Sequence, residues 1–227
     1  MDTPKHIVLF PDGNRRWAKA KNLSIQEGYL AGEQKFHDFL FWCKKRSVTT
    51  VTVFGFSTEN WKRPKEQVDF LMHLLEKYLG EGIGNFNKEQ VKVKIIGERE
   101  KLPLSLKNTI ETVEAATQNN SHMHLNLAVS YGGKWDILNA VKEIIKENVP
   151  LEKINEDLME KHLSTVGQPA PDLIIRAGGQ MRLSNFVLWQ AAYSELYFSE
   201  KMWPDFSEED LEKALLEFDS RQRRYGK

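Results

Sequence analysis

Short runs of apolar, largely β-branched residues recur along this chain, and glycine or polar residues follow each run directly. The clearest runs are residues 6–10, 49–56, 125–131 and 172–176. Runs of this length that end in turn residues are typical of buried strands, and the stretches between them have the character of helices. Strands that alternate with helices favour a mostly parallel sheet. Ligands bind outside the carboxyl ends of such strands, so the residues that follow the runs are candidate site residues.

The whole chain is expected to form one α/β domain over residues 1–227, with a mostly parallel central sheet of about six strands flanked by helices. At 227 residues, of which 41% are hydrophobic, the chain can bury one core. The loops around its prolines are too short to be domain linkers, and no internal repeat is visible. The six candidate strands are residues 5–10, 49–56, 91–97, 124–131, 172–177 and 195–198.

Residues 10–18, Phe-Pro-Asp-Gly-Asn-Arg-Arg-Trp-Ala, join the end of the first strand to the start of a helix. A helix N-terminus offers free backbone N–H groups to an anion, and Arg15 and Arg16 would add charge-assisted hydrogen bonds. A carboxylate beside phosphates usually holds Mg²⁺, which gives Asp12 a use that a turn aspartate lacks. The segment is consistent with a site for a metal-bound diphosphate. A plain turn before a solvated basic helix explains these nine residues equally well.

Three further polar clusters favour a site, because each of them follows another apolar run. They are residues 57–64 (Ser-Thr-Glu-Asn-Trp-Lys-Arg-Pro), 132–136 (Gly-Gly-Lys-Trp-Asp) and 178–185 (Gly-Gly-Gln-Met-Arg-Leu-Ser-Asn). Their glycines would let the backbone approach a ligand closely. Helix capping by Ser57 and Ser184 accounts for part of the pattern.

Composition and spacing exclude several other classes of protein. Lys and Arg together number 32, as do Asp and Glu, so no nucleic-acid-binding stripe is expected. The glycines do not form a P-loop, and no histidine pair has the spacing of a zinc protease. The single cysteine, Cys43, lies in an apolar helical stretch, which excludes an internal disulfide and suits a reducing cytosol. No apolar run is long enough to span a membrane, so a cytoplasmic protein is expected.

The motifs, in their order, resemble those of the cis-prenyltransferases, a family whose commonest bacterial member is undecaprenyl diphosphate synthase. The resemblance runs from one end of the chain to the other. It is carried by DGNRRWA (12–18), FSTENWKRP (56–64), YGGKWD (131–136), DLIIR (172–176), RLSNFVLWQ (182–190), ELYF (195–198), WPDF (203–206) and RRYG (223–226).

The resemblance implies an enzyme that condenses isopentenyl diphosphate with an allylic diphosphate (dimethylallyl, geranyl or farnesyl) into a linear cis-polyprenyl diphosphate. The allylic diphosphate ionises, the double bond of isopentenyl diphosphate attacks the cation, and a proton leaves. Mg²⁺ is the implied cofactor and a homodimer the implied assembly, and the apolar product would partition to a membrane. A hydrophobic tunnel would be walled by helical stretches 36–43 and 68–79, with Gly55 near its entrance. Without the resemblance, those stretches indicate ordinary core.

The resemblance also assigns roles to residues. Asp12 would hold Mg²⁺ with Glu195 as a second ligand, and Asn60 would lie nearest the proton-transfer step. Gly13, Asn14 and Arg16 would bind the allylic phosphates with help from Arg63, and Trp17 would pack nearby. Arg176, Arg182 and Ser184 would bind isopentenyl diphosphate, because planar guanidinium groups suit phosphates. Further substrate contacts are expected from Arg15, Tyr29, Ser57, Glu59 and Trp61, and from Arg224 and Gly226 of a tail that would reach a neighbouring subunit.

Three positions depart from the family pattern. Ile25 and Tyr29 stand where the usual bacterial enzyme has arginine and histidine, and Gln180 stands where it usually has glutamate. Tyr29 can donate only one neutral hydrogen bond, so the donor site is expected to differ. Relatives that join two dimethylallyl units into lavandulyl-type diphosphates have similar changes. The intact loop 57–60 nevertheless favours regular elongation.

A function of another class is a catalytically silent partner subunit of a heteromeric enzyme. Such subunits have degraded catalytic loops, whereas this chain keeps Asp12, Asn14, Arg16, Asn60, Arg176, Arg182 and Ser184. An aspartate-dependent phosphatase is also disfavoured, because the pair of aspartates that it needs is absent at Pro11-Asp12.

Overall fold

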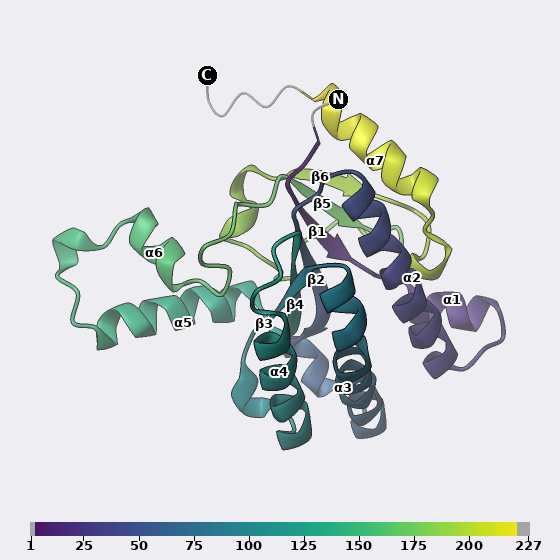
Figure 1. Ribbon diagram of the computed structural model, residues 1–227, viewed down its shortest axis with the longest axis horizontal. Helices are drawn as coiled ribbons and strands as arrows, with labels where there is room; N and C mark the ends of the chain where they lie inside the picture. Colours follow the sequence, from purple (N-terminus) through teal and green to yellow (C-terminus); the bar gives the residue numbers. More distant parts are fainter. Residues whose placement is uncertain (1–2, 222–227) are drawn as a thin grey trace.

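The computed structural model describes residues 3–221, and Figure 1 shows a central sheet with helices around it. Six strands form the sheet: β1 (His6–Phe10), β2 (Thr50–Ser57), β3 (Val91–Ile96), β4 (Met123–Tyr131), β5 (Leu173–Arg176) and β6 (Glu195–Phe198). Their order is β3-β4-β2-β1-β5-β6, and every neighbouring pair is parallel. The predicted parallel α/β sheet is confirmed. Each strand also falls within one residue of its predicted ends.

The order of the strands reverses beside β1. Strands β2, β4 and β3 lie on one side of it, whereas β5 and β6 lie on the other. Such a switch point opens a crevice at the carboxyl ends of the two strands that flank it, here β1 and β5. Phe10 is level with Arg176 in this pair of strands. The segments that follow Phe10 and Arg176 therefore face each other across the crevice.

Helices cover one face of the sheet more fully than the other. The α-helices of the described residues are α1 (Asn14–Ala20), α2 (Ile25–Lys45), α3 (Lys65–Lys88), α4 (Leu104–Thr117), α5 (Gly133–Lys146), α6 (Glu156–His162) and α7 (Glu208–Ser220). Apolar side chains of α2, α3, α4 and α7 pack on the face that carries Ile7 and Leu9. The opposite face, with Val8 and Phe10, packs against Phe186 and other residues of the segment that follows β5. Because both faces are buried, four of the five residues of β1 are apolar, and apolar residues do not alternate with polar ones along it.

Helix α2 is placed against α1 by two glycines. A capping box starts α2, since the Ser24 hydroxyl accepts from the backbone N–H of Glu27 at 3.2 Å and the Glu27 carboxylate accepts from the N–H of Ser24 at 2.7 Å. A β-carbon at Gly28 would lie 2.5 Å from the Asn14 carbonyl oxygen, and one at Gly32 would lie 2.4 Å from Asn14 Oδ1. Only glycine lets α2 approach the start of α1 this closely.

A row of buried polar side chains crosses β1, β2 and β4. The Thr52 hydroxyl oxygen lies 2.8 Å from His6 Nε2 and accepts from the Asn126 amide at 2.8 Å. Gln168 pairs with Asn126 at the end of the row. His6 Nδ1 lies 2.7 Å from the carbonyl oxygen of Pro169. Burial lowers the pKa of His6 to about 4, so the imidazole is neutral in the folded protein.

The single cysteine lies in the core. Cys43 is fully buried on α2, and burial raises the pKa of its thiol. A buried thiol with a raised pKa is a poor nucleophile. Within residues 3–221, no helix combines the length and apolar character needed to cross a membrane.

Candidate active site

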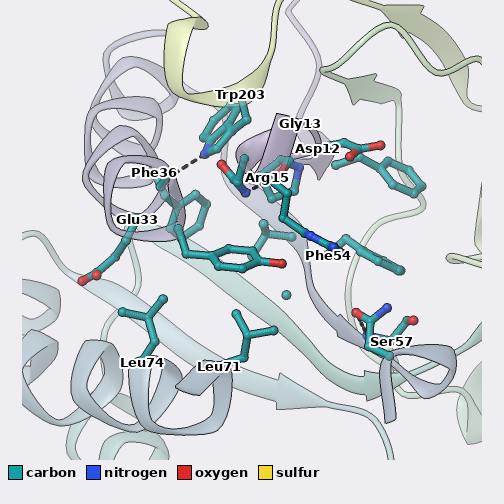
Figure 2. Close-up of a pocket in the computed structure, with 18 of the residues that line it drawn as sticks. Asp12, Gly13, Arg15, Glu33, Phe36, Phe54, Ser57, Leu71, Leu74 and Trp203 are labelled. Atoms are coloured by element: carbon teal, nitrogen blue, oxygen red, sulfur yellow. Dashed lines mark hydrogen bonds between the residues drawn. The ribbon is translucent and has the colours of Figure 1, made fainter. Parts of the chain in front are cut away.

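A cavity of about 1160 Å³ opens at the carboxyl ends of β1, β2 and β5 and continues between α2 and α3. In Figure 2, Leu71 and Leu74 approach the cavity from α3 and Phe36 from α2, whereas Asp12, Gly13 and Arg15 lie on its other side. The cavity therefore has a charged end at the crevice beside β1 and an apolar end between the two helices.

Three of the four predicted polar clusters meet at the charged end. The predicted site residues that line the cavity are Asp12, Gly13, Asn14, Arg15, Arg16, Tyr29, Ser57, Glu59, Asn60, Arg63, Arg176, Arg182 and Ser184. Ile25 also lines it. Arg224 and Gly226 lie outside the described residues. The fourth cluster, 132–136, does not line the cavity.

Asp12 lies in the loop after β1, opposite the end of β5. Its Oδ2 accepts a hydrogen bond from Arg176 Nη2 at 2.9 Å, and its Oδ1 lies 3.6 Å from Arg16 Nη2. A glycine on each side of the crevice shapes this region. Gly13, in the same loop as Asp12, has a φ of 106°. In the loop after β5, a β-carbon at Gly178 would lie 2.7 Å from Arg16 Nη2 and 2.9 Å from the Asp12 carbonyl oxygen. The Asp12 side chain keeps 35% of its surface exposed.

Arg176 is almost buried and joins both sides of the crevice. It is 5% exposed, and its guanidinium lies 4.8 Å from the ring centre of Phe10. Besides Asp12, it donates to the hydroxyl of Ser184 at 2.8 Å and to the carbonyl oxygen of Arg182. Its Nε is buried without a partner. Arg176 thus fixes the loop after β5 against the loop after β1.

The charged end of the cavity is rich in cations. Its guanidinium groups come from Arg15, Arg16, Arg63, Arg176 and Arg182, and Lys19 adds an ammonium group. Its carboxylates are those of Asp12 and Glu59, whereas Glu33 lines the cavity beside Phe36 and Leu74 (Figure 2). Guanidinium groups make charge-assisted, often bidentate hydrogen bonds with phosphates. The arrangement suits ligands that carry several negative charges.

The loop after β2 is held to the loop after β5 by Asn185, which the sequence-based assignment did not include. Asn60 Oδ1 accepts from the backbone N–H of Ser57 at 3.2 Å. Asn185 donates to the Glu59 carboxylate at 2.8 Å and accepts from the N–H of Lys134 at 2.9 Å. Burial acts to raise the pKa of Glu59, but hydrogen bonds, that from Asn185 foremost, outweigh it and lower the pKa. The only sequence signal was the position of Asn185 directly after Ser184.

Cluster 132–136 holds a loop of the site in place without lining the cavity. Asp136 is buried in the first turn of α5, where it accepts from the Tyr131 hydroxyl at 2.8 Å and from Gln190 at 3.0 Å. It also accepts from the backbone N–H and the hydroxyl of Ser164 at 3.0 and 2.6 Å. The Gly133 N–H donates to the Asn185 carbonyl oxygen at 2.6 Å. This cluster therefore positions Asn185 and the loop that carries Ser184.

Tyr29 has partners that its sequence position did not reveal. Its hydroxyl oxygen accepts from Arg63 Nη1 at 3.0 Å and from Gln67 Nε2 at 3.1 Å. A hydroxyl that accepts twice keeps its own proton to donate. At this position, where the donor site is expected to differ, the cavity therefore has a neutral hydroxyl that can donate a hydrogen bond and that is itself bound by the Arg63 guanidinium.

The apolar end matches part of the predicted tunnel wall. Phe36, Leu71 and Leu75 line the cavity, and so does Gly55 on β2. Val68, Met72 and Leu79 belong to the core instead. Leu74, Tyr78 and Leu127 line the cavity as well and were not predicted individually.

Three predicted site residues lie away from the cavity. The indole N–H of Trp17 donates to Asp205 at 2.8 Å, and that of Trp61 donates to the Ser130 hydroxyl at 2.9 Å. Glu195 starts β6, level with Leu173, and forms an ion pair with Arg221 at 2.6 Å. Glu195 is thus three residues, or about 10 Å, back along its strand from the level of Arg176. Glu195 therefore does not line the cavity at Asp12.

Comparison with known proteins identifies the family of this chain. Residues 10–226 match the family model described as putative undecaprenyl diphosphate synthase. Nerylneryl diphosphate synthase from the chloroplasts of Solanum lycopersicum is 46% identical over 98% of this chain and 71% of its own length. An isoprenyl transferase of Clostridium tetani is 43% identical over 98% of this chain and 89% of its own length.

Solved structures have the same fold. Lavandulyl diphosphate synthase from Lavandula x intermedia, in complex with dimethylallyl diphosphate, has a TM-score of 0.95 and 36% identity over 99% of both chains. A probable undecaprenyl diphosphate synthase from Campylobacter jejuni has a TM-score of 0.84 and 33% identity over 100% of both chains.

The parallel sheet, its switch-point crevice and the cationic cavity suit an enzyme that binds diphosphates. The chain belongs to the undecaprenyl diphosphate synthase family of isoprenyl transferases. The predicted function of a cis-prenyltransferase is confirmed.

Proposed function

We propose that the two diphosphate groups bind on either side of Asp12. The observation that supports this is the position of the Asp12 carboxylate between Arg16 on one side of the crevice and Arg176 on the other. The allylic diphosphate would contact Gly13, Asn14, Arg15 and Arg16, with Arg63 and Tyr29 at its far side. Isopentenyl diphosphate would contact Arg176, Arg182 and Ser184.

The residues around this site suit diphosphate departure. The leaving diphosphate carries several negative charges, which the arginines would stabilise through charge-assisted hydrogen bonds. The apolar end of the cavity would hold the hydrocarbon chain and exclude water from the allylic cation. Asn60 is proposed to lie nearest the proton-transfer step, with Ser57 and Glu59 in the same loop. The hydrogen bond from Ser57 to Asn60 Oδ1 leaves the Asn60 NH₂ group available to a ligand.

Asp12 is the proposed protein ligand of Mg²⁺. No group of three or more metal-binding side chains occurs among the described residues, 3–221. Mg²⁺ commonly takes one or two carboxylates and completes its shell with substrate phosphates and water, so the half-exposed Asp12 carboxylate fits an ion that arrives with a diphosphate. When bound, Mg²⁺ neutralises charge on the leaving diphosphate. Glu195 is not proposed as a ligand of the same ion within one chain.

A homodimer is the proposed assembly, supported by the outer face of α5. Leu138, Val141 and Ile145 are exposed and follow one another at helical spacing. Figure 1 shows α5 and α6 extending away from the sheet, where a second copy could cover that face. The buried free thiol of Cys43 suits a reducing compartment such as the cytoplasm. The apolar product would leave the enzyme for a membrane.

Product analysis tests the proposal. The protein would be incubated with Mg²⁺, labelled isopentenyl diphosphate and dimethylallyl, geranyl or farnesyl diphosphate, each in turn. Mass spectrometry and proton NMR of the dephosphorylated product should then identify a linear chain with new cis double bonds. Absence of any product with all three donors would overturn the proposal in favour of the silent partner subunit.

Irregular coupling is the second candidate, and one observation favours it. The solved structure with the TM-score of 0.95 is a lavandulyl diphosphate synthase that holds dimethylallyl diphosphate. Ile25 and Tyr29 lie in the cavity of this chain where the donor diphosphate is proposed to bind. In that case dimethylallyl diphosphate alone would yield a branched product without isopentenyl diphosphate. The same NMR measurement separates the two skeletons, and we expect the linear one because the loop 57–60 is intact.

A further inference from the structure

A second, smaller cavity lies farther along the same elements. Its volume is about 210 Å³, and its lining includes Leu40 of α2, Phe86 of α3 and Met123 of β4. On β4, Leu127 lines the large cavity and Met123 the small one, which places them four residues or about 13 Å apart along the strand. The small cavity therefore continues the line of the large one, towards the amino ends of the strands.

The ring of Tyr78 separates the two cavities. Tyr78 lines the large cavity and is absent from the lining of the small one. Its ring centre lies 5.9 Å from that of Phe36, which lines the large cavity. On the other side it lies 5.8 Å from Phe86 and 5.1 Å from His37, both of which line the small cavity. An aromatic partition thus closes the apolar end of the large cavity.

The partition is buried and uncharged. Tyr78 is 7% exposed, and its hydroxyl oxygen is buried without a hydrogen-bond partner. Burial, together with the nearby Glu33, raises the pKa of this hydroxyl, so it stays neutral. A neutral ring is compatible with contact by an apolar chain, whereas an ion at this place would not be.

We propose that Tyr78 ends the growth of the prenyl chain and that the product is therefore short. This inference rests on the proposed function, since it concerns the same cavity. From Leu71 to Tyr78 the wall of α3 extends for seven residues, or about 10 Å, and the hydrocarbon has to fit within that depth. When its far end reaches the Tyr78 ring, a further condensation has no room.

Removal of the ring should join the two cavities. The small cavity would add room for about seven carbon-sized groups, at roughly 30 Å³ for each. That is enough for one additional C5 unit. Lys44 and Glu89, which form an ion pair at 2.6 Å, line the small cavity as well.

The test compares the products of wild type, Tyr78→Ala and the milder truncation Tyr78→Leu, each with dimethylallyl diphosphate, excess isopentenyl diphosphate and Mg²⁺. The major product of Tyr78→Ala should be at least one C5 unit longer than that of wild type, with Tyr78→Leu at the same length or between. Tyr78→Phe keeps the ring and should leave the length unchanged. Leu79→Ala also empties a buried site on α3, but one that lines neither cavity, so its product should match wild type.

A binding measurement does not depend on turnover. Calorimetry in the presence of a chelator would give dissociation constants of wild type and Tyr78→Leu for geranyl, farnesyl and geranylgeranyl diphosphates. The affinity of each protein should rise with the length of the prenyl chain up to a limit. For wild type, that limit should come one member of the series earlier than for Tyr78→Leu. Identical product lengths or an identical affinity limit in wild type and both truncations would overturn the role of Tyr78. If wild type makes no product, but its affinity still stops rising one member of the series before that of Tyr78→Leu, only the proposed function is refuted.

Discussion

Asp12 meets two demands at once, because it neutralises a nearly buried guanidinium and also faces the cavity. Arg176 depends on it, being only 5% exposed and already committed to Ser184 and the Arg182 carbonyl. Removal of one partner from such a pair leaves a buried charge without compensation. A substitution at Asp12 therefore has to be interpreted for stability as well as for catalysis.

Two substitutions separate these demands. Asp12→Asn keeps an oxygen that can accept from Arg176 but removes the negative charge, whereas Asp12→Ala removes both. We expect both variants to lose activity by about a hundredfold to a thousandfold or more, because the leaving diphosphate loses its Mg²⁺ ligand. Thermal unfolding should show a loss of about 1–3 kcal/mol for Asp12→Ala, since Arg176 is left partly unpaired, and a smaller loss for Asp12→Asn. Full turnover by either variant, or by wild type in excess chelator, would contradict the metal assignment.

Arg182 tests the assignment of the two diphosphate subsites. Its side chain is exposed at the cavity, and only its carbonyl oxygen accepts from Arg176. Arg182→Ala should therefore leave Arg176 in place. It should weaken the binding of isopentenyl diphosphate by about 1.5–3 kcal/mol, which corresponds to a rise in KM of about ten- to a hundredfold. The KM of the allylic donor should change much less.

Arg182→Lys is the matched variant for this measurement. It keeps the charge but loses the planar fork that binds phosphate in bidentate fashion, so an intermediate KM is expected. Equal losses for both substrates in Arg182→Ala would show that the two subsites are assigned wrongly.

At the level of elements, strands were easier to predict than the contacts between loops. Mostly apolar runs bounded by turn residues locate the strands, because strands that are buried on both faces, such as β1 and β5, are largely apolar. That the site lies at the carboxyl ends of the strands followed from the parallel arrangement of the strands. The orientation of Trp17 and Trp61 could not be predicted, since the partners of their indole N–H groups, Asp205 and Ser130, are distant in sequence.

The supporting role of Asp136 escaped prediction for a similar reason. Its motif resembles a binding loop. One hydrogen bond to Asp136 comes from Tyr131 of the same motif, but the other three come from Ser164 and Gln190, which only the tertiary fold brings to it. Likewise, the wall formed by Tyr78 depends on how far α2 and α3 stand apart, which helical spacing alone does not set.

The buried row across β1, β2 and β4 makes stability depend on pH. His6 has a pKa of about 4 in the folded protein against 6.5 in the unfolded chain, so the unfolded chain binds more protons between these values. Stability should be complete above pH 6.5 and fall as the pH drops towards 4, by roughly 3 kcal/mol for this group.

Urea unfolding of wild type and His6→Gln at pH 7.5 and pH 5 would measure this effect. The glutamine variant lacks a titrating group, so its stability should fall less between the two conditions even if it is less stable at pH 7.5. The difference between the two proteins isolates His6 from the other histidines. Equal pH dependence in both would contradict the low pKa.

At the scale of the whole molecule, the apolar outer face of α5 is the feature that a single chain leaves unexplained. Ile145 is 68% exposed and Leu138 is 60% exposed. If this face joins two copies, Ile145→Lys should shift the protein from dimer to monomer in light scattering coupled to size-exclusion chromatography. Leu104→Lys, at a position that is 72% exposed on α4, provides the control and should leave the mass unchanged. A monomeric wild type would refute the homodimer.

The reversal of strand order beside β1 also has a consequence for how the protein is made. One edge of β1 pairs with β5, which begins at Leu173, whereas β1 ends at Phe10. The ribosome therefore makes β5 more than 160 residues after β1, and that edge of β1 stays unpaired until then. Until then, an apolar strand keeps one row of backbone hydrogen-bonding groups unpaired, which is a state prone to wrong associations. The ion pair between Asp12 and Arg176 forms at this late closure. The diphosphate site is therefore among the last parts of the nascent molecule to take shape, and a truncated chain that ends before β5 would carry none of its function.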